Sequence, residues 1–169
     1  ITNQKIYNRI SNILKGVPKE FKSKIHIRNQ NVNKYDSIRS SLKKYNFLKY
    51  SNIKNNFYDE LEKYNLTIHF FIGTPFFECM AINKPSIIVL DEEMHLPFDI
   101  KFRKYIKYFK KYNLIFNDEK KALEFLKKDQ KYLENWWNNK KMILLKESFN
   151  KTYNYVPKNY DKELKRLIE

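Results

Sequence analysis

The stretch LTIHFFIGTPFFECMAINKPSIIVLD, residues Leu66–Asp91, decides the fold of this chain. It opens with an apolar run, Leu66–Ile72, which is followed by Gly73 and a Thr-Pro pair. A helix-compatible segment, Phe76–Ile82, then leads into a second apolar run that ends at Asp91. Strand, glycine turn, helix and strand in this order indicate a βαβ unit with parallel strands. Amides at the start of the helix in such a unit can hold phosphate.

Similar elements recur on both sides of this unit. The pattern predicts further strands at 24–28, 47–50 and 114–116. It predicts helices at 6–14, 36–45, 57–64, 100–112 and 119–127, one long helix over 130–153, and a last helix over 161–168. Short strands that alternate with helices predict an α/β fold, a Rossmann-like three-layer sandwich with a mostly parallel sheet and a helical C-terminal tail. We expect one domain, residues 1–155, and a C-terminal helix within 156–169 that packs on it.

The composition indicates a folded domain that is not a membrane protein. The chain has 169 residues, of which 42% are hydrophobic, so it can bury a core. No apolar run approaches the ~20 residues that span a bilayer, and no signal-peptide pattern opens the chain. The single cysteine, Cys79, cannot form an internal disulfide, so we expect a cytoplasmic location. The first residue is Ile1, and we expect a piece cut from a longer chain.

The net charge of +15 raises the question of an anionic partner. The cations are nearly all Lys, and they are spread along the chain beside abundant Asn, Ile, Tyr and Phe, which is what an AT-rich coding sequence produces. The recognition motifs of RRM, KH and zinc-finger domains are absent, so a nucleic-acid-binding module is the alternative and not the preferred function. A positive field also attracts anionic membranes, and we expect a peripheral contact with the inner face of the membrane.

The residues quoted first carry a resemblance to a known family. The segment GTPFFECMAINKP, Gly73–Pro85, with the strand SIIVLD after it, resembles the C-terminal nucleotide-binding domain of GT-B glycosyltransferases. More narrowly, the chain is similar to a bacterial family of surface-carbohydrate transferases with a TxYLETLAxNxPTI segment, a helix ending in YF, a short GI strand and a WW helix. The counterparts here are Tyr108-Phe109, Leu114-Ile115 and Trp136-Trp137. Phe76-Phe77 replace the usual Tyr-Leu, and the Trp expected near Asp91 is missing.

The resemblance implies a site for a nucleotide-diphosphate sugar or a CMP-sugar, with no covalently bound cofactor and no metal. The implied donor-binding residues are Arg28, Gly73, Thr74, Phe76 and Glu78, with Asp91 and His95 as further candidates. Gly73 and Thr74 would face the diphosphate at the helix start. Glu78 would accept hydrogen bonds from ribose hydroxyls, and Arg28 would reach phosphate oxygens. No catalytic residue is predicted, because in the GT-B fold the acceptor site and usually the base come from an N-terminal domain. We therefore expect this chain alone to be inactive.

Structural interpretations of the same residues stay open at this stage. Gly73 also fits a simple turn, Glu78 a solvated helix carboxylate, and Arg28 an ion pair with a nearby acid. A scaffold with a degenerate site would carry the same residues. Three histidines and Cys79 lack the spacing of metal ligands. Because Trp136 and Trp137 are adjacent, we expect one to pack in the core and the other to reach a neighbouring surface.

Overall fold

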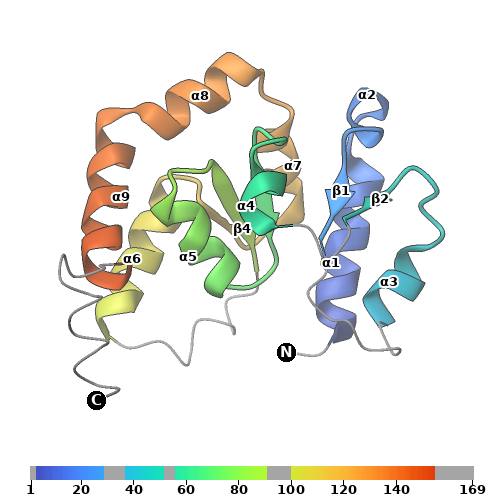
Figure 1. The fold of residues 1–169 in the computed structure, drawn as a ribbon, viewed down its shortest axis with the longest axis horizontal. Helices are drawn as coiled ribbons and strands as arrows, with labels where there is room; N and C mark the ends of the chain where they lie inside the picture. Colours follow the sequence, from blue (N-terminus) through green and yellow to red (C-terminus); the bar gives the residue numbers. More distant parts are fainter. Residues whose placement is uncertain (1–2, 29–36, 52–55, 91–99, 155–169) are drawn as a thin grey trace.

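The computed structural model describes residues 3–28, 37–51, 56–90 and 100–154 (Figure 1). Its helices are α1 (Asn3–Gly16), α2 (Lys19–Lys22), α3 (Ser37–Leu42), α4 (Phe57–Leu61), α5 (Thr74–Ala81), α6 (Ile100–Lys111), α7 (Glu119–Leu126), α8 (Gln130–Asn138) and α9 (Lys140–Tyr153). Its strands are β1 (His26–Ile27), β2 (Lys49–Tyr50), β3 (Thr67–His69), β4 (Ser86–Val89) and β5 (Ile115–Phe116). The prediction of an α/β fold is confirmed.

The strands form two small parallel sheets in the described part of the chain. One sheet pairs β1 with β2, and the other has the order β3-β4-β5. The segment around α4 meets β1 through side chains, since the His26 and Tyr64 rings lie 5.0 Å apart and Arg28 pairs with Glu60. We expected one sheet, but the strands form two: β1 and β2 belong to one sheet, and β3, β4 and β5 belong to the other. The Rossmann-like three-layer arrangement of the whole chain stays a prediction.

Helix α5 covers one face of the larger sheet. His69 of β3 is level with Ile88 of β4, so their side chains share this face. The His69 ring meets Phe76 of α5 edge-on at 5.7 Å between centroids. Phe76 in turn touches Phe109 of α6 and Phe149 of α9 at 5.7 and 6.1 Å. An aromatic core thus joins α5, α6 and α9, which lie together on the left of Figure 1.

The other face of this sheet packs against α7. Val89 is level with Phe116 of β5, and both point away from the face that carries Ile88. The Phe116 ring meets Phe125 of α7 at 5.4 Å. Helix α7 also packs against α1, whose Ile13 is buried in the same core. The sheet is therefore covered on both faces by elements far apart in the sequence.

Helix α1 links this core to a second, smaller one. It packs against α7 on one side and against α3 on the other (Figure 1). The residues buried in the smaller core are Leu14, Leu42 and Leu48. Because Ile13 and Leu14 are adjacent on α1, they point into different cores. The two small sheets are joined through this helix.

Two asparagines end the helices that precede β4 and β5. Asn83 and Asn113 have φ of 59° and 60°, the left-handed conformation that closes helices. The amide of Lys84 donates to the carbonyl of Cys79 at 2.7 Å, and the amide of Leu114 donates to that of Phe109 at 2.8 Å. Each turn directs the chain from the helix straight into the next buried strand.

The prediction of one long helix over 130–153 is wrong, because this segment forms two helices, α8 and α9. Asn139 has an extended backbone, with φ of −68° and ψ of 153°, and separates α8 from α9. Its side chain accepts a hydrogen bond from the amide of Met142 at 3.0 Å, so it caps the start of α9. The last predicted helix, 161–168, and the tail 156–169 lie outside the described residues.

Candidate functional site

The bend between β3 and α5 is where the sequence predicted an anion. Gly73 is the N-cap of α5, with φ of −161° and ψ of −176°, an extended conformation open to any residue. Its carbonyl accepts from the amides of Phe76 and Phe77 at 2.9 and 3.3 Å, and Pro75 has no amide hydrogen. Thr74 at the helix start is exposed. Thr74 therefore offers accessible surface at the start of α5, beyond the carboxyl end of β3.

The ring of Phe71 covers part of this bend. A Cβ placed on Gly73 would lie 2.6 Å from Cε2 of Phe71, so the ring rests directly on the glycine. Phe71 is itself 43% exposed. The bend is thus shielded on the Gly73 side and open on the Thr74 side.

Phe76, one of the predicted donor-binding residues, lies in the core. Its side chain is 0% exposed, and its ring is surrounded by aromatic rings of β3, α6 and α9. A ring without exposed surface cannot contact a ligand in this conformation. Phe76 anchors the start of α5 in the core and so holds the bend in position.

Glu78 lies one turn after Thr74, on the same side of α5, because residues four apart on a helix are neighbours. It is half-buried. The hydroxyl of Tyr58 on α4 donates to its Oε1 at 3.4 Å, and the Glu78 carboxylate raises the pKa of Tyr58. Tyr58 is 45% exposed. No pattern in the sequence indicates this partner, which lies 20 residues before Glu78.

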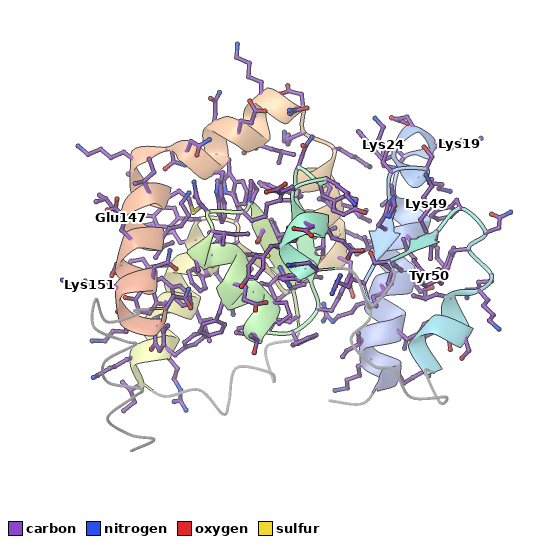
Figure 2. The ribbon with its side chains drawn as sticks, viewed as in Figure 1. Lys19, Lys24, Lys49, Tyr50, Glu147 and Lys151 are labelled. Atoms are coloured by element: carbon purple, nitrogen blue, oxygen red, sulfur yellow. The ribbon has the colours of Figure 1, made fainter. Side chains whose placement is uncertain are left out.

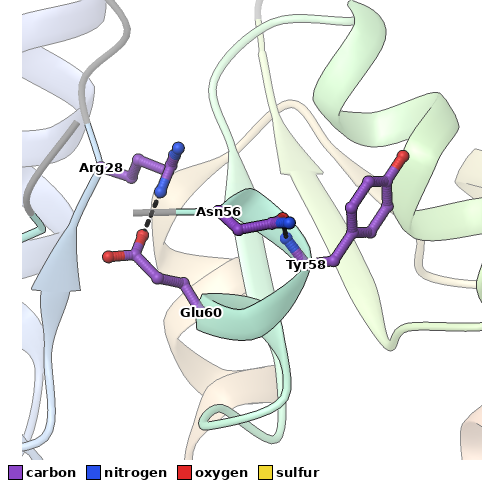
Figure 3. Close-up of polar contacts among 4 residues, drawn as sticks. All are labelled: Arg28, Asn56, Tyr58 and Glu60. Atoms are coloured by element: carbon purple, nitrogen blue, oxygen red, sulfur yellow. Dashed lines mark hydrogen bonds and ion pairs between the residues drawn. The ribbon is translucent and has the colours of Figure 1, made fainter. Parts of the chain in front are cut away.

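Arg28 pairs with a carboxylate other than Glu78. Its guanidinium donates to Glu60 of α4, a buried residue (Figure 3). It also lies 5.4 Å from the ring centroid of Phe57. Tyr58 and Glu60 are two residues apart, about 200° around a helix, so they point to opposite sides. Helix α4 therefore stands between Arg28 and Glu78, and the structure does not bring these two predicted residues together.

The other two candidates, Asp91 and His95, lie outside the described residues. The structure thus places Gly73, Thr74 and Glu78 on one bend and helix, with Tyr58 as an addition. Among the residues that it describes, no group of His, Cys, Asp or Glu side chains gathers in a way that could hold a metal ion.

A row of side chains on α9 holds the backbone of α5. Three residues spaced by four along α9 donate to acceptors spaced by three along α5 and its end. The pairs are Asn154 to the carbonyl of Phe77 at 3.0 Å, Asn150 to the carbonyl of Met80 at 2.9 Å, and Lys146 to Oδ1 of Asn83 at 2.7 Å. The two helices run antiparallel, and this row fixes the helix that carries the candidate site.

Asn83 is the point where this row meets the paired tryptophans. The indole of Trp137 donates to both the carbonyl and Oδ1 of Asn83 at 3.0 Å. The indole of Trp136 donates to the carbonyl of Tyr112 at 2.7 Å. Both tryptophans are buried, which corrects the expectation that one would reach a surface. Both indole rings can be buried because each ring nitrogen donates to a carbonyl at the end of a different helix.

Lys146 is a buried cation within this contact. Its Nζ donates to the carbonyl of Trp137 at 2.8 Å and lies 4.1 Å from the centre of that ring. Burial lowers its pKa from 10.5 to about 8. The cation is held by two oxygens and a ring face in place of water.

We expect stability to rise with pH above 8 because of Lys146. Between pH 8 and 10.5 the unfolded chain keeps a proton on this amine that the folded chain has lost, so higher pH favours folding. Relative to Lys146→Met, the free energy of unfolding of the native chain should rise by about 2 kcal/mol over this range. Urea titrations at a series of pH values measure this. Lys151→Met, on the exposed side of α9, is the matched control. If the free energy of unfolding of the native chain rises equally relative to Lys151→Met and to Lys146→Met, Lys146 is not the group responsible.

A second polar cluster lies beneath α5. Oγ1 of Thr67 is 2.7 Å from Oγ of Ser86 and 3.1 Å from Nε2 of His69, and it donates to Sγ of Cys79 at 3.7 Å. Burial lowers the pKa of His69 to about 4, so its imidazole is neutral at physiological pH. Cys79 is fully buried. This cluster joins the beginnings of β3 and β4 to α5 and has no exposed nucleophile.

Comparison with known proteins identifies the family of the chain. In the described residues, no helix has the length and apolar character needed to cross a membrane. No curated protein and no solved structure matches the sequence. The model of one family, described as LIC12162 family transferase, matches residues 4–168. This covers nearly the whole chain and supports the prediction of a transferase, whereas it gives no support to the nucleic-acid alternative. The chain belongs to the LIC12162 family of transferases.

Proposed function

We propose that this chain is the nucleotide-sugar-binding part of a glycosyltransferase that builds surface carbohydrate, equivalent to the C-terminal domain of a GT-B enzyme. One observation carries the proposal: Thr74 is exposed at the start of α5, at the carboxyl end of the parallel strand β3, with Glu78 one turn further on the same side. Ligands of parallel α/β sheets bind outside the carboxyl ends of the strands. The match to a transferase family supports the same function.

In this proposal the diphosphate of the donor lies at the bend. The amide and hydroxyl of Thr74 donate to phosphate oxygens, and the positive end of α5 favours the charge that develops as the sugar departs. Phe71 covers the Gly73 side and keeps water from that side of the phosphate. The anion therefore enters from the Thr74 side.

Glu78 and Tyr58 receive the sugar ring of the nucleoside. The carboxylate of Glu78 accepts hydrogen bonds from two neighbouring hydroxyls, and a ribose presents such a pair. The 3.4 Å contact with Tyr58 is long for a hydrogen bond between oxygens, so a ribose hydroxyl can replace it readily. Arg28 has an indirect role in this proposal. Its ion pair with Glu60 holds α4, the helix that carries Tyr58, in position.

Substitution of Glu78 tests this function. Glu78→Gln keeps the size of the side chain and removes its charge, so we expect nucleotide-sugar binding to weaken by about tenfold or more. Isothermal titration calorimetry with UDP-, GDP-, CMP- and dTDP-sugars gives the affinity. Binding and not turnover is the readout, since we propose that the acceptor and base come from another domain. Glu134→Gln, an exposed carboxylate on α8, is the matched control. Unchanged affinity in Glu78→Gln would show that Glu78 is not a ligand.

A further inference from the structure

We propose that the outward face of α6 and the adjoining edge of α9 dock this protein on a membrane surface that contains anionic lipid. Helix α6 reads IKFRKYIKYFKK, with Lys or Arg at half of its 12 positions and no acidic residue. The positive charge is therefore concentrated here beyond the general lysine excess of the chain. This inference is independent of the nucleotide-sugar site.

The helical repeat sorts the residues of α6 into two faces. Phe102, Ile106 and Phe109 are buried and face the core. The residues about 180° away are Lys104, Lys107 and Lys111, which fall at helical spacing and are all exposed. They form one straight row along the solvent side of the helix. A flat surface of negative charge can meet all three at once.

Exposed apolar side chains lie beside this row. Tyr105 of α6 contacts α9 through its hydroxyl, which is 2.8 Å from Oγ of Ser148 and 3.1 Å from Oγ1 of Thr152. Tyr108 is one turn after Tyr105, and Leu144 is one turn before Ser148. Because Phe102 near the start of α6 meets Tyr153 at the end of α9 and Phe109 near the end of α6 meets the earlier Phe149, the helices are antiparallel. Tyr108 and Leu144 therefore lie on the same side of the Tyr105 contact, and they are 50% and 56% exposed.

Lysines of α9 extend the charged surface. Lys141 lies one turn before Leu144 and is exposed. Lys151 lies one turn after Ser148 and is on the outer side of α9 in Figure 2. The acidic Glu147 lies on the same outer side, one turn after Leu144 and one turn before Lys151, so it offsets part of the positive charge of α9 (Figure 2). Hence the joint surface of α6 and α9 is a pair of apolar groups with lysines around them and one acid, Glu147, on the α9 side, and the row on α6 supplies most of its charge.

The pairing of lysine with apolar groups favours lipid over nucleic acid. Lysine acts as a point charge that needs no fixed partner geometry, which suits mobile headgroups. Tyrosine is enriched where apolar and aqueous phases meet, and leucine gains from burial at the acyl boundary. Nucleic acid would leave Leu144 without a partner. Each lysine near an anionic bilayer contributes about a fivefold gain in partition.

The test compares two triple variants of the full chain that lose the same charge. Lys104→Gln/Lys107→Gln/Lys111→Gln removes the α6 row, whereas Lys19→Gln/Lys24→Gln/Lys49→Gln removes three lysines at the opposite end of the molecule (Figure 2). The probe is co-sedimentation with vesicles of phosphatidylcholine containing one third phosphatidylglycerol. We expect partition to fall about a hundredfold in the α6 variant and at most a few fold in the other.

Further variants make the result decisive. Lys104→Arg/Lys107→Arg/Lys111→Arg keeps the charge and should keep the binding, and Leu144→Ser should weaken it without changing its salt dependence. Equal losses in the two glutamine variants would overturn the proposal, because net charge and not this face would then bind. Absence of vesicle binding by the native chain would also overturn it, as would native binding to a single-stranded oligonucleotide that exceeds binding to the vesicles and is lost in the α6 variant.

Discussion

Replacing Phe76 by alanine should lower the free energy of unfolding by about 3–5 kcal/mol, the cost of removing a buried aromatic ring. Phe76 has no exposed surface and lies at the centre of the rings that join β3, α6 and α9. Its loss would leave a cavity between the sheet and three helices, because the surrounding rings are held by their own contacts. Urea denaturation followed by circular dichroism measures the change.

Phe71 is the matched control for this substitution. It lies on the other side of the Gly73 bend, is 43% exposed and touches the glycine with its ring. Phe71→Ala should lower the free energy of unfolding by about 1 kcal/mol or less, as expected for a surface contact. Similar losses in the two variants would mean that Phe76 is not the packing centre of α5.

Acid should destabilise this protein through His69. Its pKa is about 4 in the folded chain and 6.5 in the unfolded chain, so the unfolded state binds more protons between these values. The contribution to stability is complete above pH 6.5 and is lost as the pH falls toward 4. It amounts to about 3 kcal/mol, the free energy of a shift of this size.

The measurement compares the native chain with His69→Gln, which cannot titrate in this range. The difference between their free energies of unfolding should shrink by about 3 kcal/mol when the pH is lowered from about 7 to about 4. His26→Gln is the control. Burial also lowers the pKa of His26, but this side chain is exposed at the edge of the smaller sheet, so its effect should be smaller. A difference that does not change with pH would show that folding does not lower the pKa of His69.

The central βαβ unit could be predicted from the sequence because its signals are local. Two apolar runs, a glycine-proline turn and a short helical segment lie within 26 residues, and β3, α5 and β4 form there as parallel strands around a helix. The strands at either side were predicted at the right places but longer than they are. The observed strands are shorter than the predicted ones because each has few partners. In the described part of the chain, β1 and β2 pair only with each other, and β5 pairs only with β4.

The candidate site could be predicted only in part. Thr74 and Glu78 share one side of α5 because helix geometry fixes their spacing, and that required no tertiary information. The partner of Glu78 could not be found, since nothing in the sequence indicates which way Tyr58 of α4 points. The choice of Glu60 as the partner of Arg28 also depends on the position of α4, 32 residues away. The donor-binding role of these residues stays a prediction.

The segment Asn83-Lys84-Pro85 between α5 and β4 shows the same limit. Asn83 fits a helix end, and its left-handed conformation is a local property. Its second role, as acceptor for Trp137 and Lys146, joins residues that are 54 and 63 positions apart. Trp137 can be buried because of this contact, and Trp136 because it donates to Tyr112, although helix periodicity alone would put adjacent residues on different faces. The break at Asn139 lets α9 turn back along α5 and bring Lys146 to this point.

Local signals in the sequence sufficed to predict most helices and strands, the parallel direction of the central strands and the bend at Gly73 and Thr74, but not helix α2 or the break at Asn139. Backbone preferences and hydrophobic periodicity act over a few residues, and a single sequence records them. Tertiary structure alone decided the division into two sheets, the burial of Phe76, the partners of Arg28 and Glu78, and the row of contacts between α9 and α5. These depend on which surfaces meet, and that is a property of packing between distant segments.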